Sequence, residues 1–478
     1  RNNQTWNQVI RDTNSHGADS GRKKRSGLLT TWTWFGTRNP RLPDYCSQKW
    51  ALYLLAVFPD VGTVLKMMAI TRIFSSFKIK NYRYLWASDS LQAWAEYMEL
   101  IVLSWLILEI SSSPLLVGLY GALRFMGTIM SPIFGVIVDK FDRKMLLVLI
   151  RGSFALNGIV ILCIAFAGVL TTTAILIMAG FLGLSKTFDM VIRQSILPAV
   201  VGDKNLNNAV ALSRAGGDVT QMIGPIVGGV VLAFLSVKVS YGIIVGLYFI
   251  SLFFAINIGK ISVKSSAGTL NVINNFKIGM KFIHQTPVVA GLLVLAVIIN
   301  LATFPIYFGL ISVLAKEVFD STSTGLGFMM GSYSCGAVLG SLIAGSRDGS
   351  GKTGRFSVGG TVLWSGAIIL LALVPNVVSS FPVLFLAGLG QSLCTVAIAM
   401  MLLSLTPDNL RGRVMGLRQL AVYSLPLGLL ISGTIAEMWG VKVAIFIDGL
   451  MGILLVMGCV VIWPTLWNVS QAKEYKEK

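Results

Sequence analysis

Long apolar runs alternate with short charged turns over most of this 478-residue chain. Each run has about the 20 residues that an α-helix needs to cross the hydrocarbon core of a bilayer. The pattern predicts an all-α polytopic membrane protein with twelve transmembrane helices. The expected spans are 85–110, 115–138, 145–169, 172–198, 207–236, 240–259, 287–315, 323–346, 356–378, 381–406, 412–438 and 441–463.

The predicted helices divide the chain into five segments. We expect an N-terminal extension (1–66), a six-helix half (67–259), a cytoplasmic linker with an amphipathic helix (260–286), a second six-helix half (287–465) and a cytoplasmic tail (466–478). Residues 1–48 are polar, basic and without periodicity, so we expect them to be disordered, and the apolar stretch 50–58 is too short to span a bilayer. We expect the functional protein to start near Met67 or Met68 and the preceding segment to be dispensable.

Composition agrees with a bilayer as the main partner. Hydrophobic residues make up 54% of the chain and charged residues 13%, whereas soluble domains carry about a quarter charged residues. The net charge of +18 comes from Lys and Arg scattered over short loops and one tail. No basic face with interleaved aromatic residues is evident, so we expect no nucleic-acid partner.

The same charges predict the orientation, because short cytoplasmic loops carry an excess of Lys and Arg. One set of loops holds only Lys238, Lys316 and Lys442. The other set, which we expect to be cytoplasmic together with both termini, holds Lys140, Arg143, Lys144, Lys204, Lys260, Lys264, Lys277, Lys281, Arg347, Lys352, Arg355, Arg411 and Arg413. The protein should therefore reside in the plasma or inner membrane.

The two six-helix halves share a short internal pattern. Asn205-Leu206 and Val210 recur as Asn409-Leu410 and Val414, each time between the fourth and fifth helix of a half, and a proline follows in the next helix. Two parallel six-helix repeats are typical of secondary transporters that bind substrate between the halves.

Several motifs resemble those of the major facilitator superfamily. The loop Gly135–Lys144 (GVIVDKFDRK) is similar to the loop 2–3 signature, with Asp142 where many members have Gly, and Gly224–Gly229 is similar to the antiporter motif of the fifth helix. Within the superfamily, Asn81–Trp86, Arg193–Pro198 and Pro407–Val414 resemble the branch that contains enterobactin-type siderophore exporters and macrolide efflux proteins.

The loop has a physical rationale of its own. We expect Gly135 to allow close helix packing, Asp139 to accept hydrogen bonds near a helix end, and the cations to bind carboxylates or helix C-termini. The resemblance implies that the loop latches the outward-facing state, whereas the alternative is a plain topogenic loop. The residues concerned are Gly135, Asp139, Lys140, Asp142, Arg143 and Lys144.

The predicted fifth helix carries a second motif. Gly224, Pro225, Gly228 and Gly229 permit a kink and tight helix contacts, because proline removes a hydrogen bond and glycine has no side chain. The motif indicates either the antiporter role that the resemblance implies or ordinary helix packing.

The first predicted helix carries acids inside the membrane. Asp89, Gln92, Glu96 and Glu99 are spaced three, four and three residues apart and share one face. Carboxylates at this depth cost about 2.5–3.5 kcal/mol each and usually face water or a partner. The fourth helix offers such partners on one face: Lys186, Asp189 and Arg193.

Two interpretations of these charges stay open. They form structural ion pairs, or at least one of Asp89, Glu96, Glu99 and Asp189 takes up and releases a proton as the half moves. Repulsion between Glu96 and Glu99 with partial desolvation favours a protonated carboxyl, so we favour one of these two residues. Arg124 is a further candidate partner for the acids or for an anionic substrate, whereas Arg151, Arg214, Arg418 and Glu437 lie near helix ends and can snorkel.

The resemblance also implies cavity residues on the seventh and tenth helices. Together with Gln92, the candidates are Asn300, Thr303, Tyr307, Gln391 and Thr395. This second wall is polar but neutral, which suits a large amphipathic substrate better than a small polyanion.

Other chemistry finds little support. The chain has two histidines and five widely separated cysteines, so we expect no metal site, no catalytic residues and no disulfide framework. The stretch 346–353 (SRDGSGKT) lacks the first glycine and the preceding strand of a phosphate-binding loop, so no nucleotide cofactor is expected.

We therefore predict a monomeric secondary transporter, not an enzyme, that exports a small amphipathic molecule by alternating access, with protons as the coupling ion. The alternatives are an importer or lysophospholipid translocator of the same fold, a membrane sensor without transport, and an integral membrane enzyme.

Overall fold

The computed structural model describes residues 75–259, 272–345, 353–407 and 410–468. Within these ranges the chain is helical and contains no β-strand. The expected N-terminal extension, most of the tail and the stretch 346–352 lie outside the described residues.

The helices of the first half follow the predicted spans. The short helix η1 (Ser75–Lys78) precedes α5 (Lys80–Ser111), α6 (Pro114–Met126), η2 (Gly127–Met130), α7 (Ser131–Lys140), α8 (Arg143–Phe166), α9 (Thr172–Phe234) and α10 (Val237–Ile256). In α9, Gly202 adopts φ 67°, which glycine tolerates without a Cβ penalty, so two spanning helices meet there.

The second half begins with the amphipathic helix α11, which lies within the predicted linker. Its elements are α11 (Val272–Gln285), α12 (Pro287–Ile298), η3 (Ile299–Thr303), η4 (Ile306–Leu310), α13 (Ile311–Val313), η5 (Leu314–Val318), α14 (Ser323–Gly345), α15 (Thr353–Leu373), α16 (Val377–Leu405), α17 (Arg411–Ala421), α18 (Ser424–Trp439), α19 (Val441–Ile462) and α20 (Thr465–Asn468). The elements η3, η4 and η5 are π-helical turns within one long span.

Eleven helices among the described residues are long and apolar enough to cross a bilayer. The remaining predicted span, the first in the chain, is α5, which has 32 residues and so extends about 48 Å at the usual rise. This helix is longer than the hydrocarbon thickness of about 30 Å. It also carries several of the charged residues described below. The chain is a multi-pass membrane protein.

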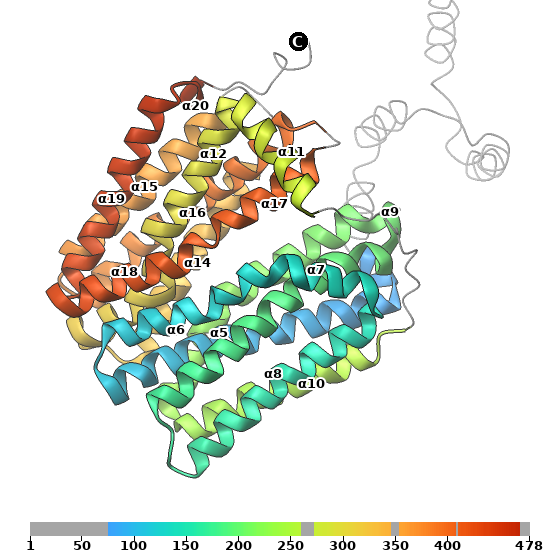
Figure 1. Ribbon diagram of the computed structural model, residues 1–478. Coiled ribbons are helices and arrows are strands. Elements are labelled where there is room, and N and C mark those ends of the chain that lie inside the picture. The colour runs from blue at the N-terminus through green and yellow to red at the C-terminus, as the bar shows by residue number, and fades with distance from the viewer. Residues whose placement is uncertain (1–74, 260–271, 346–352, 408–409, 469–478) are drawn as a thin grey trace, which may run out of the picture. The chain divides into compact units, whose positions relative to one another are not determined.

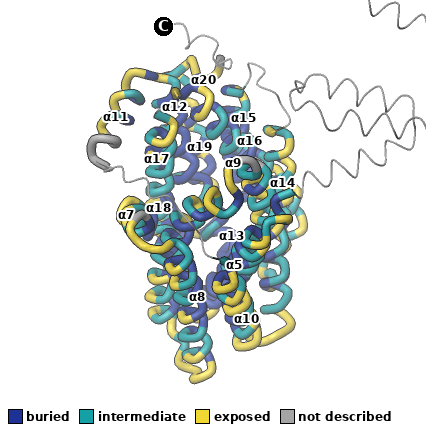
Figure 2. The backbone as a smooth tube through the Cα atoms, turned by 90° about the vertical axis from the view of Figure 1, so that its right-hand side faces the viewer, coloured by how far each residue is buried: buried dark blue, intermediate teal, exposed yellow. Residues whose placement is uncertain are grey.

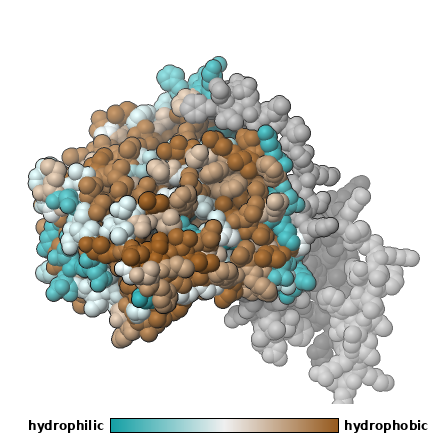
Figure 3. Space-filling model, turned by 60° about the horizontal axis from the view of Figure 1, so that its bottom comes forward, coloured by the Kyte–Doolittle hydropathy of each residue, from teal (hydrophilic) through white to brown (hydrophobic). Residues whose placement is uncertain are grey.

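Apolar side chains cover the outside of the helices. Leu149 and Leu156 on α8, and Phe249 and Phe253 on α10, are all exposed, and Figure 3 shows a largely hydrophobic face with polar residues at its edges. Buried residues lie on the inner sides of the helices, as Figure 2 shows. This distribution is the one that lipid requires, because lipid tails solvate apolar side chains.

Helices α5 to α10 pack mainly against one another, as do α12 to α19 (Figure 1). The two groups meet where α6 packs against α18 and where α9 packs against α14. The internal repeat and the domain boundaries stay predictions.

Two ends of the helix bundle are distinguished by their turns. We call the end with Lys140–Arg143 and Arg411–Arg413 the basic end, and the end with Ser111–Pro114 and Trp439–Val441 the opposite end. Contacts between the two groups are tightest toward the opposite end. A Cβ on Gly118 would lie 2.5 Å from the backbone oxygen of Leu429, and one on Gly327 would lie 2.7 Å from that of Pro225.

Candidate functional site

A cavity of about 610 Å³ lies between the two groups of helices. The first group contributes side chains of α5, α6, η2 and α9, and the second group contributes side chains of α12, η3, η4, α16, α17 and α18 with their connecting residues. Leu100, Phe308 and Leu425 form the wall toward the opposite end, whereas Arg214 and Arg418 line the cavity toward the basic end. The cavity therefore lies on the basic-end side of the close contacts between α6 and α18.

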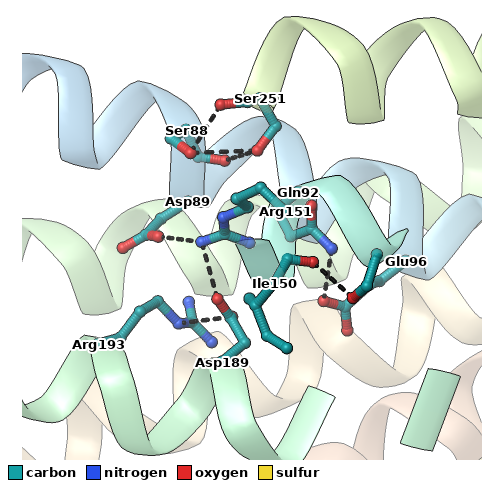
Figure 4. Close-up of polar contacts among 10 residues, drawn as sticks. Ser88, Asp89, Gln92, Glu96, Ile150, Arg151, Asp189, Arg193 and Ser251 are labelled. Carbon is teal, nitrogen blue, oxygen red and sulfur yellow. Dashed lines mark hydrogen bonds and ion pairs between the residues drawn. The ribbon is translucent and has the colours of Figure 1, made fainter. Parts of the chain in front are cut away.

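A carboxylate and an ammonium group face each other on the cavity wall. Lys186 Nζ lies 3.2 Å from Glu96 Oε2, and the two side chains are 34% and 12% exposed. Gln92 Nε2 donates to Glu96 Oε1 at 3.5 Å, and all three residues line the cavity. Figure 4 shows Gln92 and Glu96 along one side of α5. The predicted spacing on α5 and α9 thus brings this pair together.

A second network lies deeper in the first group. Arg151 on α8 contacts Asp89 Oδ1 on α5 at 2.5 Å and Asp189 Oδ1 on α9 at 3.2 Å. Arg193 Nε then contacts Asp189 Oδ2 at 3.0 Å, one helical turn away, as Figure 4 shows. Since Arg151 and Asp189 are almost completely buried, this network joins three helices through charges that compensate one another.

Arg151 corrects an expectation. Its position near the start of a predicted span indicated a snorkelling side chain, but the structure buries it completely between two aspartates. Arg151 is buried because it pairs with Asp89 and Asp189 on two other helices. No local sequence pattern indicates such a contact.

Glu99 lies apart from the cavity and is fully buried. Tyr241 and Tyr248 on α10 both donate a hydrogen bond to its carboxyl group, the second at 2.7 Å. The two tyrosines are seven residues apart and so share a helix face. This regular spacing is the signal that could have revealed them from the sequence.

Arg124 lines the cavity but makes no ion pair with the described carboxylates. Its Nη1 donates to Tyr120 Oη at 2.9 Å and its Nη2 donates to the backbone oxygen of Glu96 at 3.3 Å. Both contacts orient the guanidinium group beside the first helix, where its charge interacts with Glu96 and Glu99 and can attract an anion in the cavity.

The second wall differs from the prediction. Asn300 and Thr395 line the cavity together with Gln92. The structure places Thr303, Tyr307 and Gln391 away from it: Thr303 bonds its own helix backbone, Tyr307 lies against Ser334 Oγ at 3.4 Å, and Gln391 accepts from Ser392.

This wall is also not neutral, because Arg418 and Gln419 line it. Arg418 forms no ion pair with a described residue, whereas Arg214 and Asp218, on the facing wall, pair at 3.1 Å. Position near a helix end suggested snorkelling for both arginines, yet both lie on the cavity wall. They lie on α17 and α9, which face each other across the cavity.

The loop between α7 and α8 is held at its helix ends. Asp142 Oδ1 accepts from the backbone nitrogen of Met145 at 2.9 Å and so caps α8. Arg143 Nη1 donates to the backbone oxygen of Ser195 at 3.0 Å. The expected close packing at Gly135 is wrong, since a Cβ there would meet nothing within 4 Å. The Asp139 side chain lies outside the described ones, and Lys140 and Lys144 are exposed or partly exposed.

The glycines of the other motif do allow close contacts. A Cβ on Gly224 would lie 2.9 Å from Tyr97 Cβ, and one on Gly228 would lie 2.9 Å from Met98 Cα. Gly229 approaches α14, where Ser323 Oγ donates to its backbone oxygen at 3.0 Å. Pro225 lies inside the helix. The motif therefore fits α9 against α5 and α14.

The described residues hold no group of three or more His, Cys, Asp or Glu side chains arranged for a metal ion. The four cysteines among them are free thiols: Cys163, Cys335, Cys394 and Cys459.

Comparison with known proteins decides the family. The sequence profile of a family described as "Transmembrane secretion effector" matches residues 71–476. The chain belongs to the major facilitator superfamily. Similar superfamily members include the enterobactin exporter EntS of Shigella boydii serotype 18 and that of Escherichia coli O157:H7. Each is 25% identical over 305 residues, which cover 63% of this chain and 71% of the relative.

Solved structures of superfamily transporters share the fold. The nucleoside transporter NupG superposes with a TM-score of 0.66 at 14% identity, over 80% of this chain and all of that chain. A bacterial homologue of the human lysosomal transporter Spinster, inward-facing and occupied, gives a TM-score of 0.65 at 11% identity, over 80% and 96%. By its family, this chain is a membrane transporter with a small-molecule substrate.

Proposed function

We propose that the protein exports a small amphipathic molecule, drug-like or siderophore-like, in exchange for protons, and that it acts as a monomer in the plasma or inner membrane. The observation that carries the proposal is the Glu96–Lys186 pair on the wall of a cavity between the two helix groups.

The position of the cavity supports alternating access. The groups touch through α6–α18 and α9–α14 toward the opposite end, while the cavity lies toward the basic end. Since a positive bias favours the cytoplasmic side, this arrangement corresponds to a conformation that loads substrate from the cytoplasm. Rocking of the groups about the central site would expose the same wall to the other side.

Glu96 is the best candidate for the proton-carrying group. It is partly exposed on the cavity wall, so water can deliver and remove a proton there. Glu99 and Asp189 are buried away from water, and Asp89, which pairs with the buried Arg151, is not among the residues that line the cavity. Protonation of Glu96 or binding of substrate would break the Glu96–Lys186 ion pair and leave each side chain to bind another group. Substrate binding and protonation of Glu96 are therefore linked.

The wall supports an amphipathic substrate that carries negative charge. Arg124 and Arg418 lie on it without a carboxylate partner among the described residues, while Phe125, Phe304 and Phe308 supply apolar surface. Cationic groups attract an anionic headgroup, and aromatic faces bind an apolar or aromatic body. The similarity to an enterobactin exporter supports the outward direction of transport.

A growth screen and a flux assay test the proposal together. An efflux-deficient bacterium that expresses the full chain is challenged with a panel of amphipathic compounds, with and without a protonophore. Any compound that the protein protects against is then added to acidified inverted vesicles, where export draws protons out of the lumen and a pH dye reports the alkalinisation.

The proposal predicts that Glu96→Gln abolishes the substrate-dependent alkalinisation and the protection, while Glu109→Gln, an exposed acid on the same helix, leaves both intact. Protection that survives the protonophore and Glu96→Gln would show that protons do not drive transport. Uptake into intact cells in place of efflux would assign an importer.

A further inference from the structure

A buried carboxyl group lies in the second helix group, outside the cavity. Asp448, two turns into α19, has no exposed surface, and it is not among the cavity residues. Neither of its oxygens has a hydrogen-bond partner. An isolated carboxylate in such surroundings would pay a large desolvation cost, whereas a neutral carboxyl group pays much less.

Two buried hydroxyl groups without partners lie in the same region. Ser432 on α18 is the polar neighbour of the Asp448 side chain, and it is 1% exposed and has no other hydrogen-bond partner. Ser365 Oγ on α15 is fully buried and unpaired and lies against Gly452, one turn along the same face of α19 as Asp448. Three helices thus direct polar groups into one apolar region, where they meet only one another.

No described cation compensates the charge of Asp448. The elements that pack against α19 are α12, α15, α18, α20, η3, η4 and η5. Their charged or titratable groups are engaged or exposed elsewhere: Arg355 lies over Trp467, Glu437 bonds Ser113, Lys316 lies over Trp105, Tyr307 contacts Ser334, and Glu317 is exposed. On α19 itself, Lys442 is exposed at the first turn.

We propose that Asp448 is a proton-binding site in the second helix group, neutral in this conformation and able to release its proton when α19 moves relative to α15 and α18. The bound species is a proton rather than a metal ion. Hard cations take six or more oxygen ligands, whereas the described surroundings offer one carboxyl group and two hydroxyls. The neutral carboxyl can donate its own hydrogen to a serine oxygen, which an ionised carboxylate cannot do.

This site does not depend on the proposed transport chemistry, because it is separate from Glu96 and from the cavity. It would give the second helix group a protonation equilibrium of its own. Ionisation would place an uncompensated charge between α15, α18 and α19 and so favour a packing that admits water or a partner.

Infrared spectroscopy of the purified full chain in lipid nanodiscs tests the assignment at neutral pH. We expect a carboxylic C=O band that Asp448→Asn removes and that Glu317→Gln, at an exposed acid, leaves unchanged. Ser432→Ala keeps the carboxyl group, so it should keep this band and shift its frequency, which makes the test independent of any folding defect in Asp448→Asn.

Thermal unfolding across pH gives a second readout. The unfolded chain ionises Asp448 above about pH 4, while the folded state retains the proton. Unfolding therefore releases a proton, and the ratio of unfolded to folded protein rises about tenfold per pH unit from this group. Asp448→Asn should remove that dependence. An unchanged carboxylic band in Asp448→Asn, or an unchanged pH dependence of unfolding, would overturn the proposal.

Discussion

Glu437 of α18 accepts two hydrogen bonds at the start of α6, from Ser113 Oγ at 2.8 Å and from the backbone nitrogen of Leu115 at 3.2 Å. A carboxylate from the second helix group thus binds the N-terminus of a helix in the first group. Free amide groups and the helix dipole make this end favourable for an anion.

We expect Glu437→Gln to weaken the contact between the groups at the opposite end. Charge-assisted hydrogen bonds are worth about 1.5–3 kcal/mol, so the loss of the charge should change the equilibrium between closed and open forms of this end by roughly tenfold. Spin labels at the exposed positions Val169 and Val378 report the change as a larger share of long distances, after replacement of the exposed Cys163 and Cys335 by Ser.

Glu109→Gln is the matched control, because Glu109 is exposed near the same end and makes no ion pair with a described residue. A distance distribution in Glu437→Gln that equals the wild-type distribution would show that the contact does not hold this end closed.

Arg151 is expected to be essential for the stability of the first helix group. Arg151→Met leaves the partly buried Asp89 and the buried Asp189 without their common cation, and broken buried pairs cost about 3–5 kcal/mol. The measurement is the folded yield and the thermal unfolding midpoint in detergent. Arg83→Met, at an exposed position, should leave both unchanged.

Partial rescue separates charge from packing. If the uncompensated carboxylate causes the loss, Asp89→Asn in the Arg151→Met background should raise the unfolding midpoint, because Asp89 has no other ion pair among the described residues, whereas Asp189 keeps Arg193. A double variant no more stable than Arg151→Met would assign the effect to the lost packing of the arginine side chain.

The tyrosines around Glu99 should act as one unit. Tyr241→Phe or Tyr248→Phe removes a hydrogen bond to a buried carboxyl group, at a cost of about 1–3 kcal/mol each. In a Glu99→Gln background the same substitutions should cost less, since the amide offers one acceptor oxygen where the carboxyl group offers two. A double-mutant cycle of unfolding midpoints measures this coupling, and additive effects would contradict it.

Most of the fold could be predicted from hydropathy, because lipid demands long apolar helices and each apolar run is one such helix. Charge spacing on α5 and α9 also predicted that the fourth helix offers partners for the acids of the first, and the contact between Glu96 and Lys186 is one such pair, since both helices are regular in this region. Side chains at fixed turns of two adjacent regular helices meet at related depths.

The remainder of the site depends on features without a local signal. Arg151 and Asp89 are in contact although they are 62 positions apart in the sequence. The burial of Arg151 therefore follows only from the packing of α8 against its neighbours. Tyr307 and Thr303 lie in or after π-helical turns, η3 and η4. These wider turns rotate the following side chains away from the face that a 3.6-residue period predicts.

Gly118 is the position where a single added side chain should block closure of the opposite end. A Cβ there would lie 2.5 Å from the backbone oxygen of Leu429 and 3.2 Å from Gly433 Cα. Because both obstacles are backbone atoms, they cannot rotate away, and α6 and α18 would have to separate. We expect Gly118→Val to fold, since its new side chain faces the other helix group, but to lengthen the distance between labels at Val169 and Val378.

Transport should fall at least tenfold in Gly118→Val, because a form that cannot close at one end cannot alternate. Gly152→Val on α8 is the control: a Cβ there meets nothing within 4 Å, so label distances and transport should match the wild type. Wild-type distances in Gly118→Val would mean that α6 and α18 can separate locally without opening the interface, and the close approach of these two helices would then not control access to the cavity.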